Sequence, residues 1–232
     1  DTMAGQAEAD TYRYSRGDGH DEILEERDYD LATDVLELTD ILRSDVTYEV
    51  TPAGLILRIA ESAEGAGDAG SILIHGMLAG TDYPFEAEDA GVGIEKIVFG
   101  DGTEMTLGAL STELLAAQVT PFADYLEGST GKDTIEGKAG DDILAGNAGA
   151  DTYIYTRGDG ADWIVDSAYE SARVDRLVLH GIDPADVALR RGHDEDMILL
   201  VADSAPGAGD GGRIVVRDSL STYPGQGIEE IA

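Results

Sequence analysis

The sequence contains no cysteine, which excludes disulfide bridges, thiolate metal sites and cysteine nucleophiles and leaves the redox compartment open. It also has no apolar run near the roughly eighteen residues that a membrane-spanning helix needs. The first residues, DTMAGQAEAD, include neither the basic nor the apolar region of a signal peptide. We therefore expect no membrane span in this chain.

Basic residues are scarce, with 15 Lys plus Arg against 48 Asp plus Glu and a formal net charge of −33. Such a chain repels itself unless cations neutralise it, and it is a poor partner for nucleic acid or for an anionic membrane surface. Hydrophobic residues still make up 42% of the sequence, which is enough to build a core. A fold that depends on cations, or an acid-rich surface adapted to salt, is therefore expected.

An internal duplication organises the chain. EADTYRYSRGDGHDEILEE at 8–26 matches GADTYIYTRGDGADWIVDS at 149–167, and the correspondence extends to GIEKI at 93–97 and GIEEI at 227–231. The start of the chain aligns with DDILAGNAGADTYIY and so falls inside a repeat. We expect the sequence to be a segment of a longer protein.

Short runs of Val, Ile and Leu, separated by Gly, Asp and Pro, predict β-strands of four to seven residues. These runs are VLEL, LILRI, SILIHG, RLVLH, MILLV and RIVVR. The pair Asp101-Gly102 between apolar flanks predicts a hairpin, and TELLAAQ at 112–118 predicts one short connector helix before Pro121. The fold class is therefore expected to be all-β.

Between the two copies the chain repeats every nine residues, as GSTGKDTIE, GKAGDDILA and GNAGADTYI. Glycine occupies the first and fourth places, aspartate the sixth, and an apolar residue the eighth. The glycines suit tight turns with positive φ and close backbone approach. Carboxylates stacked turn upon turn would repel one another unless a cation lay between them, and Ca²⁺, which takes six to eight oxygen ligands, suits such a place. The alternative interpretation is a glycine-rich solenoid turn without metal.

The three nonapeptides resemble the RTX (repeats-in-toxin) family, whose repeat is G-G-x-G-x-D-x-U-x. The resemblance implies a parallel β-roll in which six residues form a turn and three form a strand, with Ca²⁺ between each turn and the second one along. Position two departs from the family pattern, with Ser129, Lys138 and Asn147 in place of glycine, and Glu8 replaces the fourth-place glycine in the first copy.

This resemblance implies which residues hold calcium. Asp133 would share one ion with Asp151, and Asp142 would share another with Asp162 in the irregular turn RGDGADWIV. By alignment, Asp1 would pair with Asp21 in the first copy, where Asp10 has no partner on its N-terminal side. The full expected metal set is Asp1, Asp10, Asp21, Asp133, Asp142, Asp151, Asp159 and Asp162, with the turn glycines Gly128, Gly131, Gly137, Gly140, Gly146, Gly149 and Gly160.

The units that follow each array look like the haemolysin-type calcium-binding-related modules that flank and cap RTX rolls. We accordingly expect a first capping module with the tail of an upstream array at 1–120, the nonapeptide β-roll at 121–165, and a second module at 166–232. The aromatic residues Tyr12, Tyr14, Tyr153, Tyr155 and Trp163 are expected to form the apolar seam between roll and cap.

The sequence shows no G-x-S-x-G elbow and no histidine spacing for zinc, so no enzyme active site is expected. The resemblance implies a calcium-binding, noncatalytic, monomeric segment of a secreted protein that folds on Ca²⁺ binding outside the cell after type I-like secretion. Two alternatives stay open. One is a calcium-stabilised adhesion or carbohydrate-binding module that contacts a cell-surface glycan or host target, and the other is the noncatalytic part of a secreted hydrolase.

Overall fold

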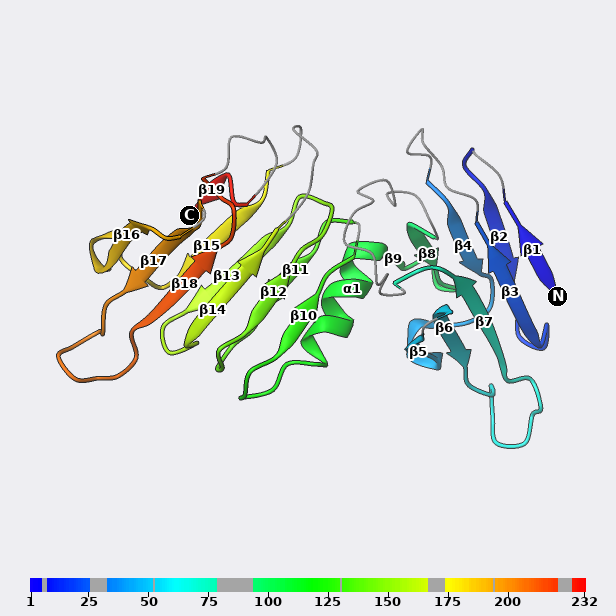
Figure 1. Ribbon diagram of the computed structural model, residues 1–232. Coiled ribbons are helices and arrows are strands. Elements are labelled where there is room, and N and C mark those ends of the chain that lie inside the picture. The colour runs from blue at the N-terminus through cyan, green and yellow to red at the C-terminus, as the bar shows by residue number, and fades with distance from the viewer. Residues whose placement is uncertain are drawn as a thin grey trace. The chain divides into compact units, whose positions relative to one another are not determined.

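The computed structural model describes residues 1–5, 8–25, 33–51, 53–78, 94–129, 131–166, 174–193, 195–220 and 227–232. Contacts divide the chain into two compact units, Asp1–Leu107 and Gly108–Ala232. Each unit contains two β-sheets (Figure 1). The stretch 108–120, which the sequence assigns to the first module, lies in the second unit together with the array.

The second unit pairs a six-stranded sheet with a four-stranded one. In spatial order the six-stranded sheet contains β10 (Tyr125–Glu127), β12 (Ile143–Ala145), β14 (Ala161–Val165), β18 (Gly212–Val216), β17 (Met197–Val201) and β16 (Val187–Arg191). The four-stranded sheet contains β11 (Thr134–Glu136), β13 (Thr152–Thr156), β15 (Arg176–His180) and β19 (Glu230–Ile231).

Successive strands from β10 to β15 alternate between these two sheets, and within each sheet they pair in parallel. This is the winding that nine-residue repeats produce when each contributes one turn and one three-residue strand. The parallel ladders confirm the expected β-roll. The module then extends the roll, since β18 continues one sheet in parallel before β17 and β16 close it as antiparallel strands.

The first unit follows the same plan. One sheet contains β1 (Thr2–Ala4), β3 (His20–Leu24), β7 (Gly70–His75), β6 (Gly54–Ile59) and β5 (Val46–Thr51). The other contains β2 (Thr11–Tyr14), β4 (Val35–Leu38), β8 (Lys96–Val98) and β9 (Glu104–Thr106). The duplication in sequence is therefore a duplication of topology, and the antiparallel β8–β9 pair around Gly102 (φ +82°) confirms the predicted hairpin.

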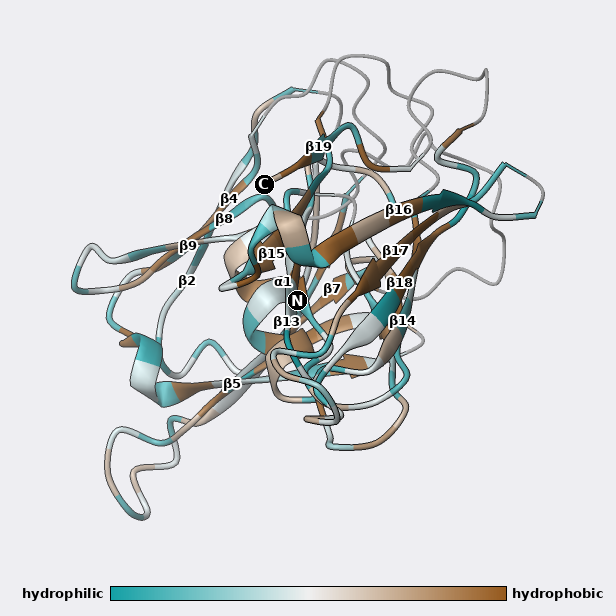
Figure 2. Cartoon of the chain, turned by 90° about the vertical axis from the view of Figure 1, so that its left-hand side faces the viewer, coloured by the Kyte–Doolittle hydropathy of each residue, from teal (hydrophilic) through white to brown (hydrophobic). Residues whose placement is uncertain are grey.

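Alternating burial along the strands builds the core of the second unit between its two sheets. The buried cluster includes Leu126, Ile135, Leu144, Tyr153 and Ile164. Figure 2 shows hydrophobic residues running along strands such as β17 and β18. Places six and eight are two residues apart, so the aspartate and the apolar residue point to the same inner side of the roll, and Asp133 and Ile135 are both fully buried. The aspartate lies at the turn, directly before the strand, and the apolar residue lies between the sheets.

Four of the five residues of the predicted aromatic seam are buried. Tyr12, Tyr14, Tyr153 and Tyr155 are buried, but Trp163 is 37% exposed. The prediction was wrong for Trp163 because it lies one residue before the inward-facing Ile164 on β14, so its side chain points to the opposite face of the sheet.

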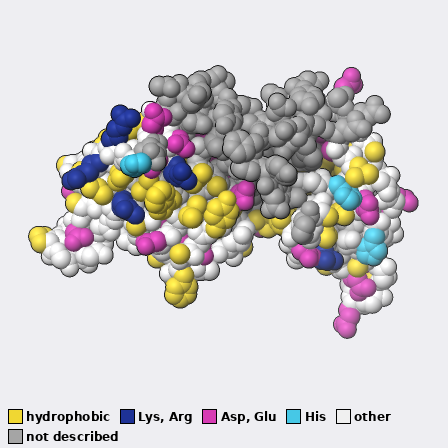
Figure 3. All heavy atoms as spheres, in the orientation of Figure 1, with side chains coloured by type: hydrophobic (Ala, Val, Ile, Leu, Met, Phe, Trp, Pro, Cys, Tyr) yellow, Lys and Arg dark blue, Asp and Glu magenta, His cyan; other side chains and the backbone are white. Residues whose placement is uncertain are grey.

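That outer face displays a row of apolar side chains. Tyr125, Ile143 and Trp163 are direct neighbours across β10, β12 and β14, and all three are exposed. Figure 3 shows hydrophobic side chains gathered over the part of this unit that faces the viewer. The row ends at β18, where the next residue in register, Val215, is buried.

The connector helix α1 (Leu107–Ala116) begins five residues earlier than the sequence predicts and covers the first turn of the array. Its Leu115 joins the core of the second unit. The Thr112 hydroxyl accepts a hydrogen bond from the N–H of Thr134 at 3.2 Å, and Gly108 packs against the carbonyl of Lys132 so closely that a Cβ there would collide. The helix therefore covers β11, the edge strand of its sheet, whose backbone N–H and C=O groups would otherwise be unpaired on that side.

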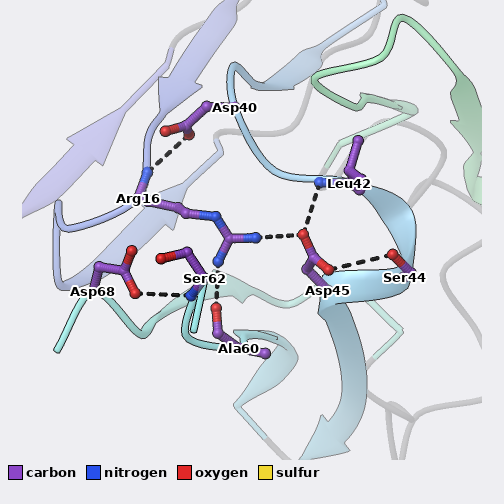
Figure 4. Close-up of polar contacts among 8 residues, drawn as sticks. All are labelled: Arg16, Asp40, Leu42, Ser44, Asp45, Ala60, Ser62 and Asp68. Carbon is purple, nitrogen blue, oxygen red and sulfur yellow. Dashed lines mark hydrogen bonds and ion pairs between the residues drawn. The ribbon is translucent and has the colours of Figure 1, made fainter. Parts of the chain in front are cut away.

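A partly buried arginine ties together the loops at one end of each module. Arg16 donates to the carboxylate of Asp45, in the short 3₁₀ helix Arg43–Asp45, and to the carbonyl of Ala60 (Figure 4). Arg157 makes the equivalent contacts with Asp186, in the 3₁₀ helix Pro184–Asp186, and with Ala202. The arginines of the repeated RGDG sequences are thus structural clamps.

Candidate metal centre

The aspartates at place six form two ladders, one on each edge of the roll. On one edge, the N–H of Asp133 donates to Oδ1 of Asp151 at 2.8 Å, and the N–H of Asp151 donates to Oδ1 of Asp175 at 2.7 Å. Each carboxylate is thereby fixed by the backbone of the turn two places before it. Asp133 and Asp151 are fully buried, and the structure brings them together as the sequence predicts.

The second ladder lies on the other edge. The N–H of Asp124 donates to Oδ1 of Asp142 at 2.8 Å, and the N–H of Asp142 donates to Oδ1 of Asp162 at 3.0 Å. Asp142 and Asp162 are both buried. The irregular turn RGDGADWIV therefore takes the place of a fourth repeat, because Gly160 forms an isolated parallel bridge with Gly140.

The glycines leave room for this stacking. A Cβ on Gly149 would lie 2.2 Å from the carbonyl oxygen of Gly131, and one on Gly160 would lie 1.9 Å from that of Gly140. First-place glycines line the carboxylates instead. A Cβ on Gly128 would lie 2.7 Å from Oδ2 of Asp133 and 2.9 Å from the Gly146 carbonyl oxygen, and one on Gly137 would lie 2.4 Å from Oδ2 of Asp142. Turn carbonyls and carboxylates thus converge in the space that the missing side chains leave.

One oxygen of each array carboxylate lacks a hydrogen-bond donor. Within the described residues, Oδ1 of Asp133, Oδ2 of Asp142 and Oδ2 of Asp151 are buried and accept no hydrogen bond. Burying a charged carboxylate oxygen that has no hydrogen-bond donor or counter-charge costs free energy, so a proton or a bound cation would stabilise these atoms. Burial accordingly raises the pKa of all three groups, that of Asp151 to about 9. Burial also raises the pKa of Asp162 to about 7.

The residues therefore fit a hard divalent cation. Carboxylate and carbonyl oxygens are the ligands that Ca²⁺ prefers. The departures at place two are also accommodated, since Lys138 (φ +60°) and Asn147 (φ +67°) adopt the left-handed conformation that glycine would take most easily. The Asn147 side-chain amide donates to the carbonyl of Gly128 at 2.8 Å, which ties alternate turns together.

The first copy is less complete. The main-chain nitrogen of Asp1 donates to Oδ1 of Asp21 at 2.6 Å, as that of Asp142 does to Asp162, but the Asp1 side chain is fully exposed. The structure therefore does not bring the Asp1 and Asp21 carboxylates together as a buried pair. Asp10 has acidic neighbours on its C-terminal side that the sequence analysis did not find, Glu25 and Asp34.

Asp159 lies at the edge of the second ladder. It is buried, and its carboxylate accepts a hydrogen bond from the N–H of Thr156 at 2.6 Å, as an aspartate in a turn does. Burial raises its pKa, and the Glu136 and Asp142 charges add to the rise. Its hydrogen bond gives it a role in shaping the turn.

Sequence reasoning missed the buried acids Asp166 and Asp175, which lie with Asp151. The alignment of the two copies already marks these two positions. Asp10, Glu25 and Asp34 align at one constant offset with Asp151, Asp166 and Asp175, so all three positions are acidic in both copies.

Residues 120–153 match the family model described as the RTX calcium-binding nonapeptide repeat, four copies. This segment is an RTX calcium-binding array. The RTX array therefore binds Ca²⁺, and the stacked aspartates on its two edges are the groups that can hold the ions. RTX repeat proteins are typically extracellular. Among the described residues, no helix has the length and apolar character needed to cross a membrane.

Two solved structures are similar to the chain that carries this RTX array. The AlgE6R3 subunit of the mannuronan C5-epimerase of Azotobacter vinelandii is 19% identical, with a TM-score of 0.24 over 48% of this chain and 78% of that one. The extracellular lipase LipA of Serratia marcescens is 12% identical, with a TM-score of 0.27 over 96% of this chain and 37% of the lipase. No curated protein sequence matches the chain.

Proposed function

We propose that this chain is a calcium-dependent folding segment of a secreted protein. It would stay unfolded where free calcium is scarce, as in a cytosol, and fold when Ca²⁺ fills the turns outside the cell. In this proposal the segment supplies a scaffold and no catalytic group, and type I-like secretion, which requires an unfolded chain, is the route that suits it.

The observation that carries the proposal is the burial of unpartnered carboxylate oxygens on both edges of the roll. Folding without a cation leaves these groups either charged in a low-dielectric interior or protonated far above their ordinary pKa. The unfolded chain avoids both costs. The net charge of −33 adds a repulsion that opposes compaction until cations bind.

The energy scale requires several ions. Extracellular calcium sites have dissociation constants of about 10⁻⁴ to 10⁻³ M, so each adds only about 1 kcal/mol at millimolar calcium. One site would be a weak switch. Two ladders whose carboxylates are hydrogen-bonded from turn to turn link the sites, because fixing one turn positions the ligand of the next. Folding should therefore be cooperative in calcium.

Circular dichroism with calcium titration tests the proposal. At about pH 8 we expect EDTA to abolish the β-sheet signal, and Ca²⁺, but not equal Mg²⁺, to restore it with a sigmoidal dependence. Asp142→Asn should raise the calcium midpoint, whereas Glu64→Gln, which removes one exposed acid, should leave it unchanged. A spectrum that is the same in EDTA and in calcium would refute the proposal.

The exposed row Tyr125, Ile143 and Trp163 supports a second candidate function, a glycan-binding face on a calcium-stabilised scaffold. Exposed aromatic side chains can stack against sugar rings. Glycan-array binding that disappears in Trp163→Ala, while calcium-dependent folding persists, would support this candidate. Phe122→Ala is the matched control, since Phe122 is more exposed than Trp163 but lies outside the row. Equal loss in both variants, or no binding by the wild type, would count against it.

A further inference from the structure

Three buried carboxylates meet where the RTX array passes into the following module. Single oxygens of Asp151, Asp166 and Asp175 all lie within 4.8 Å of one another. Asp151 belongs to the last nonapeptide, whereas Asp166 and Asp175 lie beyond the matched repeats at 120–153. All three are at most 3% exposed. The cluster thus joins the array to the module rather than repeating the spacing within the array.

Each carboxylate is held in place by a neighbour. Oδ1 of Asp175 accepts from the N–H of Asp151 at 2.7 Å, and the N–H of Asp175 donates to Oε2 of Glu229 at 2.8 Å. The buried hydroxyl of Tyr153 donates to Oδ2 of Asp166 at 2.7 Å. Such fixed groups can present their oxygens to an ion without reorganising.

An orphaned atom points into this cluster. Oδ1 of Asp151 is used by the N–H of Asp133, but Oδ2, in a fully buried side chain, has no hydrogen-bond partner among the described residues. A Cβ on Gly146 would lie 2.5 Å from that Oδ2 and 3.0 Å from Oδ2 of Asp166. The Tyr153 hydroxyl would be closer still, at 2.2 Å, so these three polar groups surround the turn at a point where only a residue without a side chain fits.

The same arrangement recurs in the first unit. Oxygens of Asp10, Glu25 and Asp34 also lie within 4.8 Å of one another. Oδ1 of Asp34 accepts from the N–H of Asp10 at 2.7 Å, Tyr12 donates to Oε1 of Glu25, and Oε2 of Glu25 is buried without a partner among the described residues. A Cβ on Gly5 would lie 2.5 Å from that Oε2. The two units thus have an acidic residue at the same three positions, together with an equivalent tyrosine and glycine.

We propose that each unit holds a further calcium ion between these three carboxylates, at Asp151, Asp166 and Asp175 in the second unit and at Asp10, Glu25 and Asp34 in the first. Ca²⁺ binds oxygen at about 2.4 Å, so two of its ligands lie at most about 4.8 Å apart. The oxygen separations meet this limit. The orphaned oxygens, which no donor satisfies, would become ligands.

The inference deepens the proposed function, because the ion would lock the module onto the roll. Asp175 directly precedes β15, and its N–H binds Glu229, which directly precedes β19. An ion at Asp151 would therefore connect the last repeat to two strands of the module. Calcium would fold array and module as one cooperative unit rather than the array alone.

Counting bound ions by native mass spectrometry of the whole chain tests the inference. Asp166→Asn should bind one Ca²⁺ fewer than the wild type, and the double variant Asp166→Asn with Glu25→Gln should bind two fewer. Asp166→Glu is the matched control. It places in the second unit the acid that the first unit has at the same position, so it should keep the full number of ions.

The outcomes separate this inference from the proposed function. A wild type that binds no calcium contradicts both. An Asp166→Asn variant with the wild-type number of ions and unchanged affinity contradicts only the further inference. If that variant does not fold, crystals of the wild type with Tb³⁺ in place of Ca²⁺ give the answer directly. An anomalous peak between Asp151, Asp166 and Asp175 supports the site, and peaks confined to the array overturn it.

Discussion

The backbone N–H of Asp133 donates to Oδ1 of Asp151, 2.8 Å away and 18 residues further along the chain. One oxygen of the Asp151 carboxylate thus holds the backbone of the turn two repeats earlier in place through this hydrogen bond. The other, Oδ2, remains without a donor among the described residues. A single side chain therefore fixes the stacking of the roll and supplies a cation ligand, so stacking and calcium binding are coupled.

Lowering the pH should stabilise the folded, metal-free protein and so partly substitute for bound calcium. An aspartate in an unfolded chain has a pKa of about 3.9, whereas burial raises the pKa of Asp151 to about 9 and that of Asp162 to about 7. Between about pH 4 and these values the folded, metal-free state binds protons that the unfolded state has lost. Its free energy of unfolding therefore falls as the pH rises through this window.

In EDTA, we expect the β-sheet signal to be stronger at about pH 5 than at about pH 8, and saturating calcium should reduce this difference. Calcium binding at about pH 7.5 should also release protons, which calorimetry in buffers of different ionisation enthalpy would measure. A metal-free β-sheet signal that grows with rising pH would contradict the assignment of buried, protonated carboxylates.

Gly160 should tolerate no side chain. Its φ of +116° disfavours an L-residue, and a Cβ would lie 1.9 Å from the carbonyl oxygen of Gly140. We expect Gly160→Ala to lower the free energy of unfolding in calcium by about 3 kcal/mol or more. Gly158→Ala is the control, because Gly158 also has positive φ (+91°) but has nothing within 4 Å of the new Cβ.

The control should cost about 1 to 2 kcal/mol, from backbone strain alone. Urea unfolding in saturating calcium measures both values. Equal costs for the two variants would show that the close stacking of Gly160 on Gly140 does not limit the fold.

The contacts of Arg157 should contribute more to the free energy of unfolding than an exposed ion pair does. Arg157 is mostly buried and donates to Asp186 and to the Ala202 carbonyl, whereas Arg176 is 48% exposed where it pairs with Glu230. We expect Arg157→Gln to lower the free energy of unfolding in calcium by about 2 kcal/mol, because the substitution removes charge-assisted hydrogen bonds. Arg176→Gln should cost less than about 1 kcal/mol.

Thermal or urea unfolding of the two variants, with calcium saturating, gives the comparison. A cost for Arg176→Gln equal to that for Arg157→Gln would mean that partial burial of the clamp adds no stability.

The structure bears out what the repeats specify locally. Place-six aspartates on alternate turns meet, as in Asp133 with Asp151 and Asp142 with Asp162. The helix was harder to delimit, because Leu107 to Ser111 gain their conformation from packing over the array rather than from a start signal in the sequence. Trp163 is exposed and not part of the predicted seam, because it alternates on β14 with the inward-facing Ile164.

The sequence by itself determined the period, the duplication, the all-β class and the calcium chemistry. Each of these follows from regularity in the sequence: glycines that permit a turn, an aspartate and an apolar residue at fixed places, and the correspondence between two copies of one unit. The tertiary structure alone decided which acids outside the repeat join the ladders. Asp166 and Asp175 are separated from Asp151 by irregular stretches with no nine-residue count, and only the parallel pairing of β13 with β15 and the closure of the module bring their oxygens together.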